Sequence, residues 1–227
     1  MAANRLHLVQ ADAVPAQPWR NGGGATRTLF TWPAAAAGAR AGTTPTAPTP
    51  PTASAAGAAA SDDWQLRLSL ADIGADGPFS AFPGVTRWFA VVEGPGVALS
   101  APGLEALLTP DSPPLAFDGA LAPMARLRGG ATRDLNLMLR GLAGGLWPAR
   151  PGAAWVPPQR WAGLFCATPV RWQLGALPPR DLPGFTLVHG WPDAAVPWRI
   201  LPAAADAAAA PPPRAWWLSA DLSPIDR

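Results

Sequence analysis

The chain has 227 residues, 49% of them hydrophobic, and its 12 tryptophans supply enough apolar surface for one large or two small cores. It has a formal net charge of +2, and its basic residues, all arginines, are scattered along the sequence, so we expect no nucleic-acid partner. There is no apolar run of membrane-spanning length and no signal-peptide pattern, and the single Cys166 excludes an internal disulfide. We therefore expect a cytoplasmic protein with no membrane partner.

The fold class is indicated by many short apolar segments. Prolines and glycines recur every few residues and no long helical period is present, which is typical of short strands joined by turns. The clearest strand is 64–71, where a tryptophan and three leucines alternate with polar or small residues. The sequence predicts an all-β, antiparallel fold with strands at 5–10, 25–32, 64–71, 86–92, 96–101, 104–109, 123–128, 133–140, 160–167, 184–189, 196–201 and 214–219.

Three consecutive glycines, Gly22, Gly23 and Gly24, precede the predicted strand 25–32. Glycine adopts positive φ without strain and allows the backbone to approach another group closely. Asn21 followed by Gly22 is also a good two-residue hairpin turn. The block is therefore either a simple turn between strands or a loop whose main-chain amides face a ligand.

Low-complexity segments suggest how the chain is divided. Residues 33–61 are almost entirely Ala, Pro, Thr and Gly, which predicts a disordered insertion between two strands, and 203–213 are similar. Residues 141–158 are rich in Gly, Pro and Ala. We place a boundary there, between an N-terminal barrel over 1–145 and a smaller C-terminal half over 146–227 that packs on it.

Polar residues occupy one face of two predicted strands. In strand 133–140, alternation places Asp134, Asn136 and Arg140 on one face and leucines on the other. Arg67 and Ser69 lie opposite the leucines of strand 64–71 in the same way. On an open sheet such a face meets water, whereas in a small barrel it lines the interior and requires hydrogen bonds or a ligand.

Arginines in such an interior would favour an acidic ligand. Guanidinium groups pair bidentately with carboxylates, so two or more of them select a small di-acid or an acidic amino-acid derivative. The alternative is structural, because Asp118 and Asp134 are able to neutralise these arginines within the barrel. The sequence leaves both uses open for Arg27, Arg67, Arg87 and Arg140.

Five segments in this order resemble the HutD/Ves family of cupin-like proteins: 19–27, 64–71, 76–87, 117–119 and 134–140. The resemblance spans about residues 15–140 and implies a cupin-like double β-barrel, or bicupin. It also implies a link to the control of histidine catabolism, with formylglutamate as a suggested ligand and no firmly attached catalytic activity.

A metal cofactor is not expected. A cupin metal site needs two histidines one residue apart, a following acid and a later histidine, because several nitrogen or oxygen ligands must converge on the ion. The chain has only His7 and His189, and neither has such neighbours. We therefore predict no metal and no other cofactor.

We predict a small-acid-binding protein rather than an enzyme, one that senses or limits the level of a metabolite. In this hypothesis Arg27 and Arg67 hold a carboxylate, while Asn136 and the glycine amides orient the rest. Two alternatives remain: an isomerase or hydrolase with Asp118 or Asp134 as general base, and a dimeric interaction module. The predicted ligand-binding residues are Asn21, Gly22, Gly23, Gly24, Arg27, Arg67, Ser69, Arg87, Asp118, Asp134, Asn136 and Arg140.

Overall fold

The computed structural model describes residues 6–33, 64–193, 195–202 and 212–222. The predicted insertion 33–61, beyond its first residue, and most of the segment 203–213 lie outside the described residues. Apart from one short 3-10 helix, η1 (Ala11–Ala13), every element in the described part is a strand, and every strand pairing is antiparallel. The all-β prediction is confirmed.

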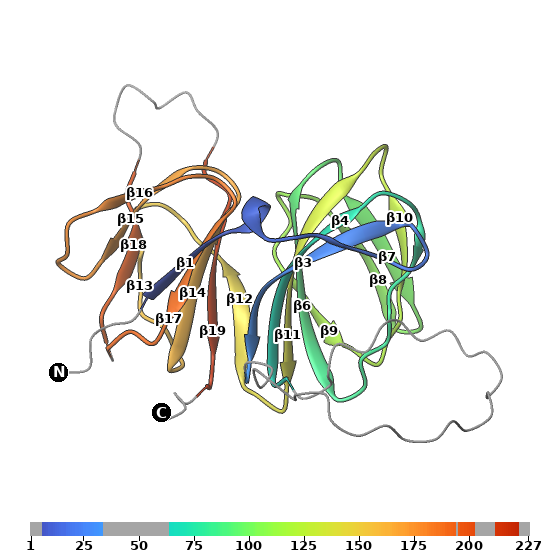
Figure 1. The fold of residues 1–227 in the computed structure, drawn as a ribbon, viewed down its shortest axis with the longest axis horizontal. Coiled ribbons are helices and arrows are strands. Elements are labelled where there is room, and N and C mark those ends of the chain that lie inside the picture. The colour runs from blue at the N-terminus through green and yellow to red at the C-terminus, as the bar shows by residue number, and fades with distance from the viewer. Residues whose placement is uncertain (1–5, 34–63, 194, 203–211, 223–227) are drawn as a thin grey trace, which may run out of the picture.

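The N-terminal barrel consists of a six-stranded and a four-stranded sheet (Figure 1). In spatial order the larger sheet contains β2 (Gln17–Pro18), β3 (Gly24–Trp32), β4 (Leu66–Ile73), β11 (Thr132–Arg140), β6 (Val85–Glu93) and β9 (Leu115–Asp118). The smaller sheet contains β5 (Gly77–Pro78), β10 (Met124–Leu127), β7 (Val97–Ala101) and β8 (Leu104–Leu108).

The C-terminal barrel repeats this plan with a five-stranded and a four-stranded sheet. The larger sheet contains β1 (Leu6–Gln10), β17 (Thr186–Gly190), β14 (Trp161–Cys166), β19 (Ala215–Ala220) and β12 (Gly144–Pro148). The smaller sheet contains β13 (Ala154–Trp155), β18 (Trp198–Ile200), β15 (Val170–Leu174) and β16 (Arg180–Leu182). Strand β1 thus lies with the C-terminal elements, paired along its whole length with β17.

All twelve predicted strands are present, with ends that shift by one or two residues. The sequence missed β2, β5, β9, β12, β13, β15 and β16. Six of these are edge strands of their sheets. Four of the six have only two or three residues, and a strand of that length is too short for an alternating pattern to be recognised. The remaining one, β15, follows a turn directly after β14.

The two barrels share one hydrophobic core, formed where their larger sheets pack face to face. From the N-terminal barrel it contains the leucines of β4 and β11, such as Leu68 and Leu137, which are fully buried. From the C-terminal barrel it contains Trp161, Phe165 and Leu218. Figure 1 shows η1 and β12 between the barrels, where the chain passes from one to the other. The leucine faces of these strands therefore hold the two barrels together.

No helix in the described part of the chain has the length and apolar character needed to cross a membrane.

Truncation of a leucine in the shared core should destabilise both barrels. We expect Leu137→Ala to lower the free energy of unfolding by about 2–5 kcal/mol, because it leaves a cavity among fully buried side chains. The matched control Leu107→Ala removes a side chain that is 51% exposed and should change stability by less than about 1 kcal/mol. Denaturant unfolding followed by tryptophan fluorescence measures both. Equal effects of the two substitutions would show that this core does not stabilise the protein.

Candidate ligand-binding site

The polar faces of β4 and β11 point into the N-terminal barrel. Ser69 of β4 lies directly opposite Asn136 of β11, and both side chains are buried. The adjacent positions Leu68 and Leu137 point the other way, into the core between the barrels. Of the two possibilities left open by the sequence, the structure shows the second: the polar face lines a barrel interior instead of meeting water.

Arg87 of β6 is the centre of a buried polar chain. Its Nε and Nη2 donate hydrogen bonds to Asn136 Oδ1 at 3.3 and 3.2 Å, and its Nη1 donates to the Ser80 carbonyl at 3.4 Å. Asn136 Nδ2 then donates to Asp134 Oδ2 at 3.1 Å. The other oxygen, Asp134 Oδ1, is buried without a hydrogen-bond partner among the described residues. Asn136 thus stands between the cation and the carboxylate, which form no salt bridge.

Three phenylalanines surround the guanidinium group of Arg87. Its Cζ lies 5.2 Å from the ring centroid of Phe79, 5.8 Å from that of Phe82 and 5.1 Å from that of Phe117. Phe79 and Phe82 belong to the turn-rich segment that follows β5, and Phe117 lies on β9 in register with Arg87. Cation–π contacts of this kind partly replace the water that burial removes from the guanidinium group.

Burial controls the charge of this cluster. Desolvation raises the pKa of Asp134 from 3.8 to about 7, against the opposing effects of Arg87 and of the Asn136 hydrogen bond. Desolvation lowers the pKa of Arg87 to about 10, while Asp134 raises it and Arg67 lowers it. The pKa of Arg67 is also lowered by desolvation. The interior therefore holds two cations that gain little compensation from protein carboxylates, and it is suited to an anionic group.

Two further arginines lie near the polar face. Arg67 Nη2 donates to Thr28 Oγ1 at 3.5 Å, which places it over β3 on the interior side. Arg140, at the end of β11, lies over the ring of Trp64 with its Cζ 5.0 Å from the centroid. Arg67 is therefore brought together with Arg87 and Ser69, whereas Arg140 lies at the end of the same strand face.

The glycine block forms a turn in which two of the glycine amides donate hydrogen bonds to groups of the turn itself. Gly22 has φ +71° and donates its amide to the Trp19 carbonyl, while the Gly23 amide donates to Asn21 Oδ1 at 3.0 Å. A Cβ at Gly24 would lie 2.2 Å from the Asp72 carbonyl oxygen, so only glycine fits there. The amides of Gly22 and Gly23 are thus occupied within the turn, and Asn21 acts as its side-chain acceptor.

Arg27 lies on the opposite face of the sheet from Arg67. It is in register with Leu70 on the leucine face, and its guanidinium group forms a salt bridge with Asp72. Arg133 binds the same carboxylate at 2.8 Å. The carboxylate clamp predicted for Arg27 and Arg67 is therefore not formed, because their side chains point to different sides of β3 and β4.

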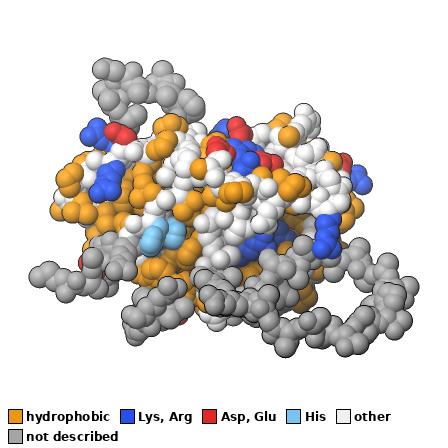
Figure 2. Space-filling model, viewed as in Figure 1, with side chains coloured by type: hydrophobic (Ala, Val, Ile, Leu, Met, Phe, Trp, Pro, Cys, Tyr) orange, Lys and Arg blue, Asp and Glu red, His pale blue; other side chains and the backbone are white. Residues whose placement is uncertain are grey.

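Arg133 completes a charged network at the seam between the barrels. Its Nη2 lies 2.7 Å from Asp12 Oδ1 of η1, and its Cζ lies 4.2 Å from the ring centroid of Phe185, just before β17. Figure 2 shows acidic and basic side chains gathered over this part of the molecule. The sequence analysis missed this network, because only the register of β3, β4 and β11 brings Arg27, Asp72 and Arg133 together.

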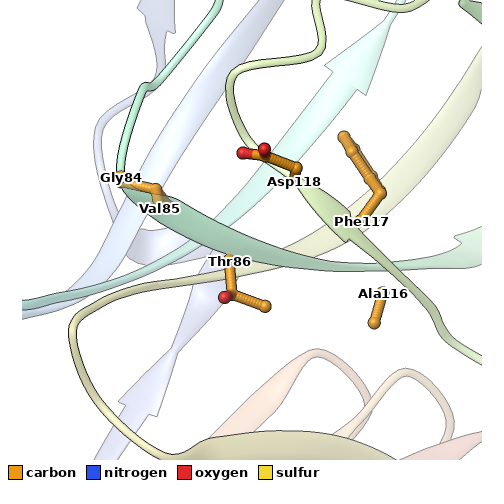
Figure 3. A pocket seen from close by; sticks show the side chains of 6 residues that line it. All are labelled: Gly84, Val85, Thr86, Ala116, Phe117 and Asp118. Atoms are coloured by element: carbon orange, nitrogen blue, oxygen red, sulfur yellow. The ribbon is translucent and has the colours of Figure 1, made fainter. Parts of the chain in front are cut away.

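Asp118 lies outside the barrel interior. It is exposed at the end of β9, and its Oδ1 accepts a hydrogen bond from the Ala120 amide at 2.8 Å. It borders a surface hollow of about 500 Å³, where Thr86 and Ala116 point to one side and the ring of Phe117 to the other (Figure 3). Asp118 therefore stabilises a turn and does not neutralise an interior arginine.

The two histidines form a pair on the C-terminal barrel (Figure 2). His7 and His189 are direct neighbours on β1 and β17, with ring centroids 5.4 Å apart. Burial, together with a smaller effect of the neighbouring His7, lowers the pKa of His189 to about 4. No group of three or more histidine, cysteine or acidic side chains that could hold a metal ion occurs among the described residues.

Two antiparallel barrels with a shared core and a polar interior in the first define a cupin-like double-barrel protein. Comparison of the chain with known protein families, sequences and structures agrees with this class and identifies the family. The HutD family model matches residues 11–145, more than half of the chain, and the protein belongs to this family.

Sequence relatives match a little more than half of the chain. An uncharacterized 21.2 kDa protein in the hutC 3′ region of Pseudomonas putida is 31% identical over 137 residues, covering 60% of this chain and 58% of that protein. Protein Ves of Citrobacter koseri is 30% identical over 128 residues, covering 56% of this chain and 54% of its own length. The chain thus spans about half the length of the curated relatives it matches.

Solved structures share the fold over almost the whole chain. A conserved protein of unknown function from Pseudomonas aeruginosa PAO1 has a TM-score of 0.71 at 23% identity, covering 96% of this chain and 100% of that one. HutD from Pseudomonas fluorescens SBW25 has a TM-score of 0.69 at 21% identity, covering 96% and 98%. An oxalate decarboxylase variant from Bacillus subtilis has a TM-score of 0.57 at 7% identity, covering 97% and 78%, which supports the cupin-like fold alone.

The raised pKa of Asp134 should make stability depend on pH in a defined direction. Between pH 4 and pH 7 the folded protein holds a proton on Asp134 that the unfolded chain has lost, so the free energy of unfolding falls as pH rises. We expect Asp134→Asn to remove a slope of up to about 1.4 kcal/mol per pH unit. Urea unfolding at several pH values measures the difference between variant and parent.

The exposed carboxylate of Asp118 gives the matched control. Asp118→Asn retains a turn acceptor and should leave the pH slope unchanged. His189 opposes the Asp134 effect in the same range, because its lowered pKa reduces stability as the pH falls from 6.5 towards 4. The comparison of each variant with the parent cancels this contribution. Parallel curves for Asp134→Asn and the parent would contradict a buried, proton-binding Asp134.

Proposed function

We propose that the N-terminal barrel binds a small carboxylate-bearing metabolite and that the protein senses or limits the level of that metabolite. The observation that carries the proposal is the buried guanidinium group of Arg87, which is only 4% exposed and forms no salt bridge with the described carboxylates. An unpaired buried charge is costly to keep in a folded protein. A ligand carboxylate at this position offsets that cost.

The surrounding side chains support a small acidic ligand with a short aliphatic part. Arg67 lies on the same face as Arg87 and lowers its pKa, so an anion would stabilise both cations. Phe79, Phe82 and Phe117 provide the apolar walls. A short acidic amino-acid derivative has this chemistry.

The family relationship suggests which acid to test first. Membership in the HutD family connects the chain to histidine utilization, and formylglutamate carries two carboxylates on a short aliphatic chain. We therefore propose formylglutamate, or a related intermediate of that pathway, as the ligand. In this proposal Arg87 and Arg67 hold a carboxylate, and Asn136 positions Arg87.

A second candidate function is an enzyme that uses Asp134 as a general base. Its pKa of about 7 is in the range where a carboxylate transfers protons efficiently at neutral pH, and its Oδ1 has no hydrogen-bond partner among the described residues. The other candidate base, Asp118, is exposed and accepts a hydrogen bond within its own turn. A chromatographic assay for turnover of formylglutamate separates this function from binding alone.

Replacement of Arg87 tests the proposed site. In the parent protein, formylglutamate at about 100 times its Kd should stabilise the fold by about 2.7 kcal/mol. We expect Arg87→Met to fold, because methionine fills an apolar environment without a buried charge, and to lose the ligand-induced shift. Thermal unfolding by tryptophan fluorescence, with near-UV circular dichroism as a fold check, measures both.

Arg27→Met is the matched control, because Arg27 lies on the other face of the sheet. Loss of its salt bridge with Asp72 should lower the melting temperature, but the shift with formylglutamate should remain. The reverse pattern, with the shift lost in Arg27→Met and kept in Arg87→Met, would contradict the assignment. Absence of a shift for any acidic metabolite with the parent protein would refute the proposed function.

A further inference from the structure

A groove of about 400 Å³ lies on the C-terminal barrel, formed by β12, β13, their connection and β19. Three tryptophans line it, one from each strand. The remaining walls are mostly proline, alanine and valine. A concave apolar surface of this size is typical of small-molecule sites. Its principal lining residues are Trp147, Trp155, Trp217, Pro148, Val156 and Arg150.

The tryptophans are arranged as a stacking surface. Trp155 lies parallel to Trp217, with centroids 5.0 Å apart and an interplanar angle of 2°. Trp147 lies 6.3 Å from Trp155 at an angle of 45°. Trp217 is buried, whereas Trp147 and Trp155 are only partly covered. Part of two large ring systems is therefore left to solvent beside Val156, which is 50% exposed, and such surfaces favour a planar apolar ligand.

Arg150 is the one charged residue among the described residues that line the groove. Its side chain is exposed and forms no hydrogen bond or ion pair with the described residues. The backbone around it is fixed, because Ala149 donates to the Ala215 carbonyl and Gly152 to the Ile200 carbonyl, each at 2.8 Å. A guanidinium group that extends from a fixed backbone and has no acidic partner among the described residues is ready to pair bidentately with a carboxylate.

We propose that this groove binds a planar aromatic carboxylic acid, with its ring against Trp147 and Trp155 and its carboxylate on Arg150. The charge pattern favours this class, because one cation matches one carboxylate, while the other described residues of the lining offer no second charge for a di-acid. The exposed indole rings favour an aromatic over an aliphatic body, since stacked rings gain more than their buried area alone. The site belongs to the other barrel and does not depend on the proposed role of Arg87.

The test uses indole-3-acetate as the probe and the full chain labelled with 5-fluorotryptophan. We expect saturable binding by calorimetry, with the largest fluorine shifts at Trp147, Trp155 and Trp217, each resonance being assigned with a Trp→Phe variant. Two comparison compounds separate the contributions of ring and charge. Indole-3-ethanol lacks the carboxylate and cyclohexylacetate lacks the aromatic ring, so each should bind at least about tenfold more weakly.

Variants test whether the carboxylate of the ligand binds to Arg150. Arg150→Gln should weaken indole-3-acetate binding about tenfold, because it removes the charge from a charge-assisted hydrogen bond. The matched control Arg126→Gln changes an exposed arginine of β10 in the N-terminal barrel and should have no effect. Arg87→Met should also leave this binding intact, which separates the groove from the proposed site in the first barrel.

Three results would overturn the proposal. The first is no binding of indole-3-acetate at millimolar concentration. The second is equal affinity of the parent and Arg150→Gln. The third is a set of fluorine shifts that avoids Trp147, Trp155 and Trp217.

Discussion

The pairing of β4 with β11 sets the arrangement on which the rest of the protein depends. Their register places leucine opposite leucine on one face and Ser69 opposite Asn136 on the other. Because successive side chains alternate across a sheet, the same two strands form the core between the barrels and the polar lining of the first barrel. A slip by one residue would bury the arginines between the barrels and expose the leucines to the polar interior.

The polar lining is built from charges that the protein compensates only in part. Arg87 donates its hydrogen bonds to a neutral side-chain amide and a backbone carbonyl. Asp134, the acid that interacts electrostatically with Arg87, has its own pKa raised by burial. The charged network at the seam differs, since Arg133 contacts Asp12, Asp72 and Glu93 directly. Arginines thus occur in two different settings. At the seam their charge is compensated by carboxylates, and the network joins the barrels, whereas in the first barrel the charge of Arg87 has no salt bridge and suits the acidic ligand that we propose. This contrast is the main physical argument for a ligand site in the first barrel.

The sequence predicted the features that depend on local pattern. Alternation in 64–71 and 133–140 gave the strands and their faces, and the five family segments indicated the double barrel. The sequence did not predict that Arg27 lies on the leucine face, outside the interior of the first barrel, because one alternating strand does not show which of its sides faces a barrel interior. Asp118 was placed inside, although its short edge strand and following turn expose it. The position of β1 beside β17 was also missed, because this pairing joins residues that are 176 to 184 positions apart, beyond the range of local pattern.

The most direct test of the central claim is to observe the Arg87 guanidinium group by NMR. The Nε–Hε signal of Arg87, assigned with the Arg87→Met variant, should exchange slowly with water in the parent protein because the group is buried. The account predicts that formylglutamate or a related acid shifts this signal in a saturable manner, as a carboxylate hydrogen bond forms. A saturable response at other residues that leaves the Arg87 signal unchanged would contradict the account.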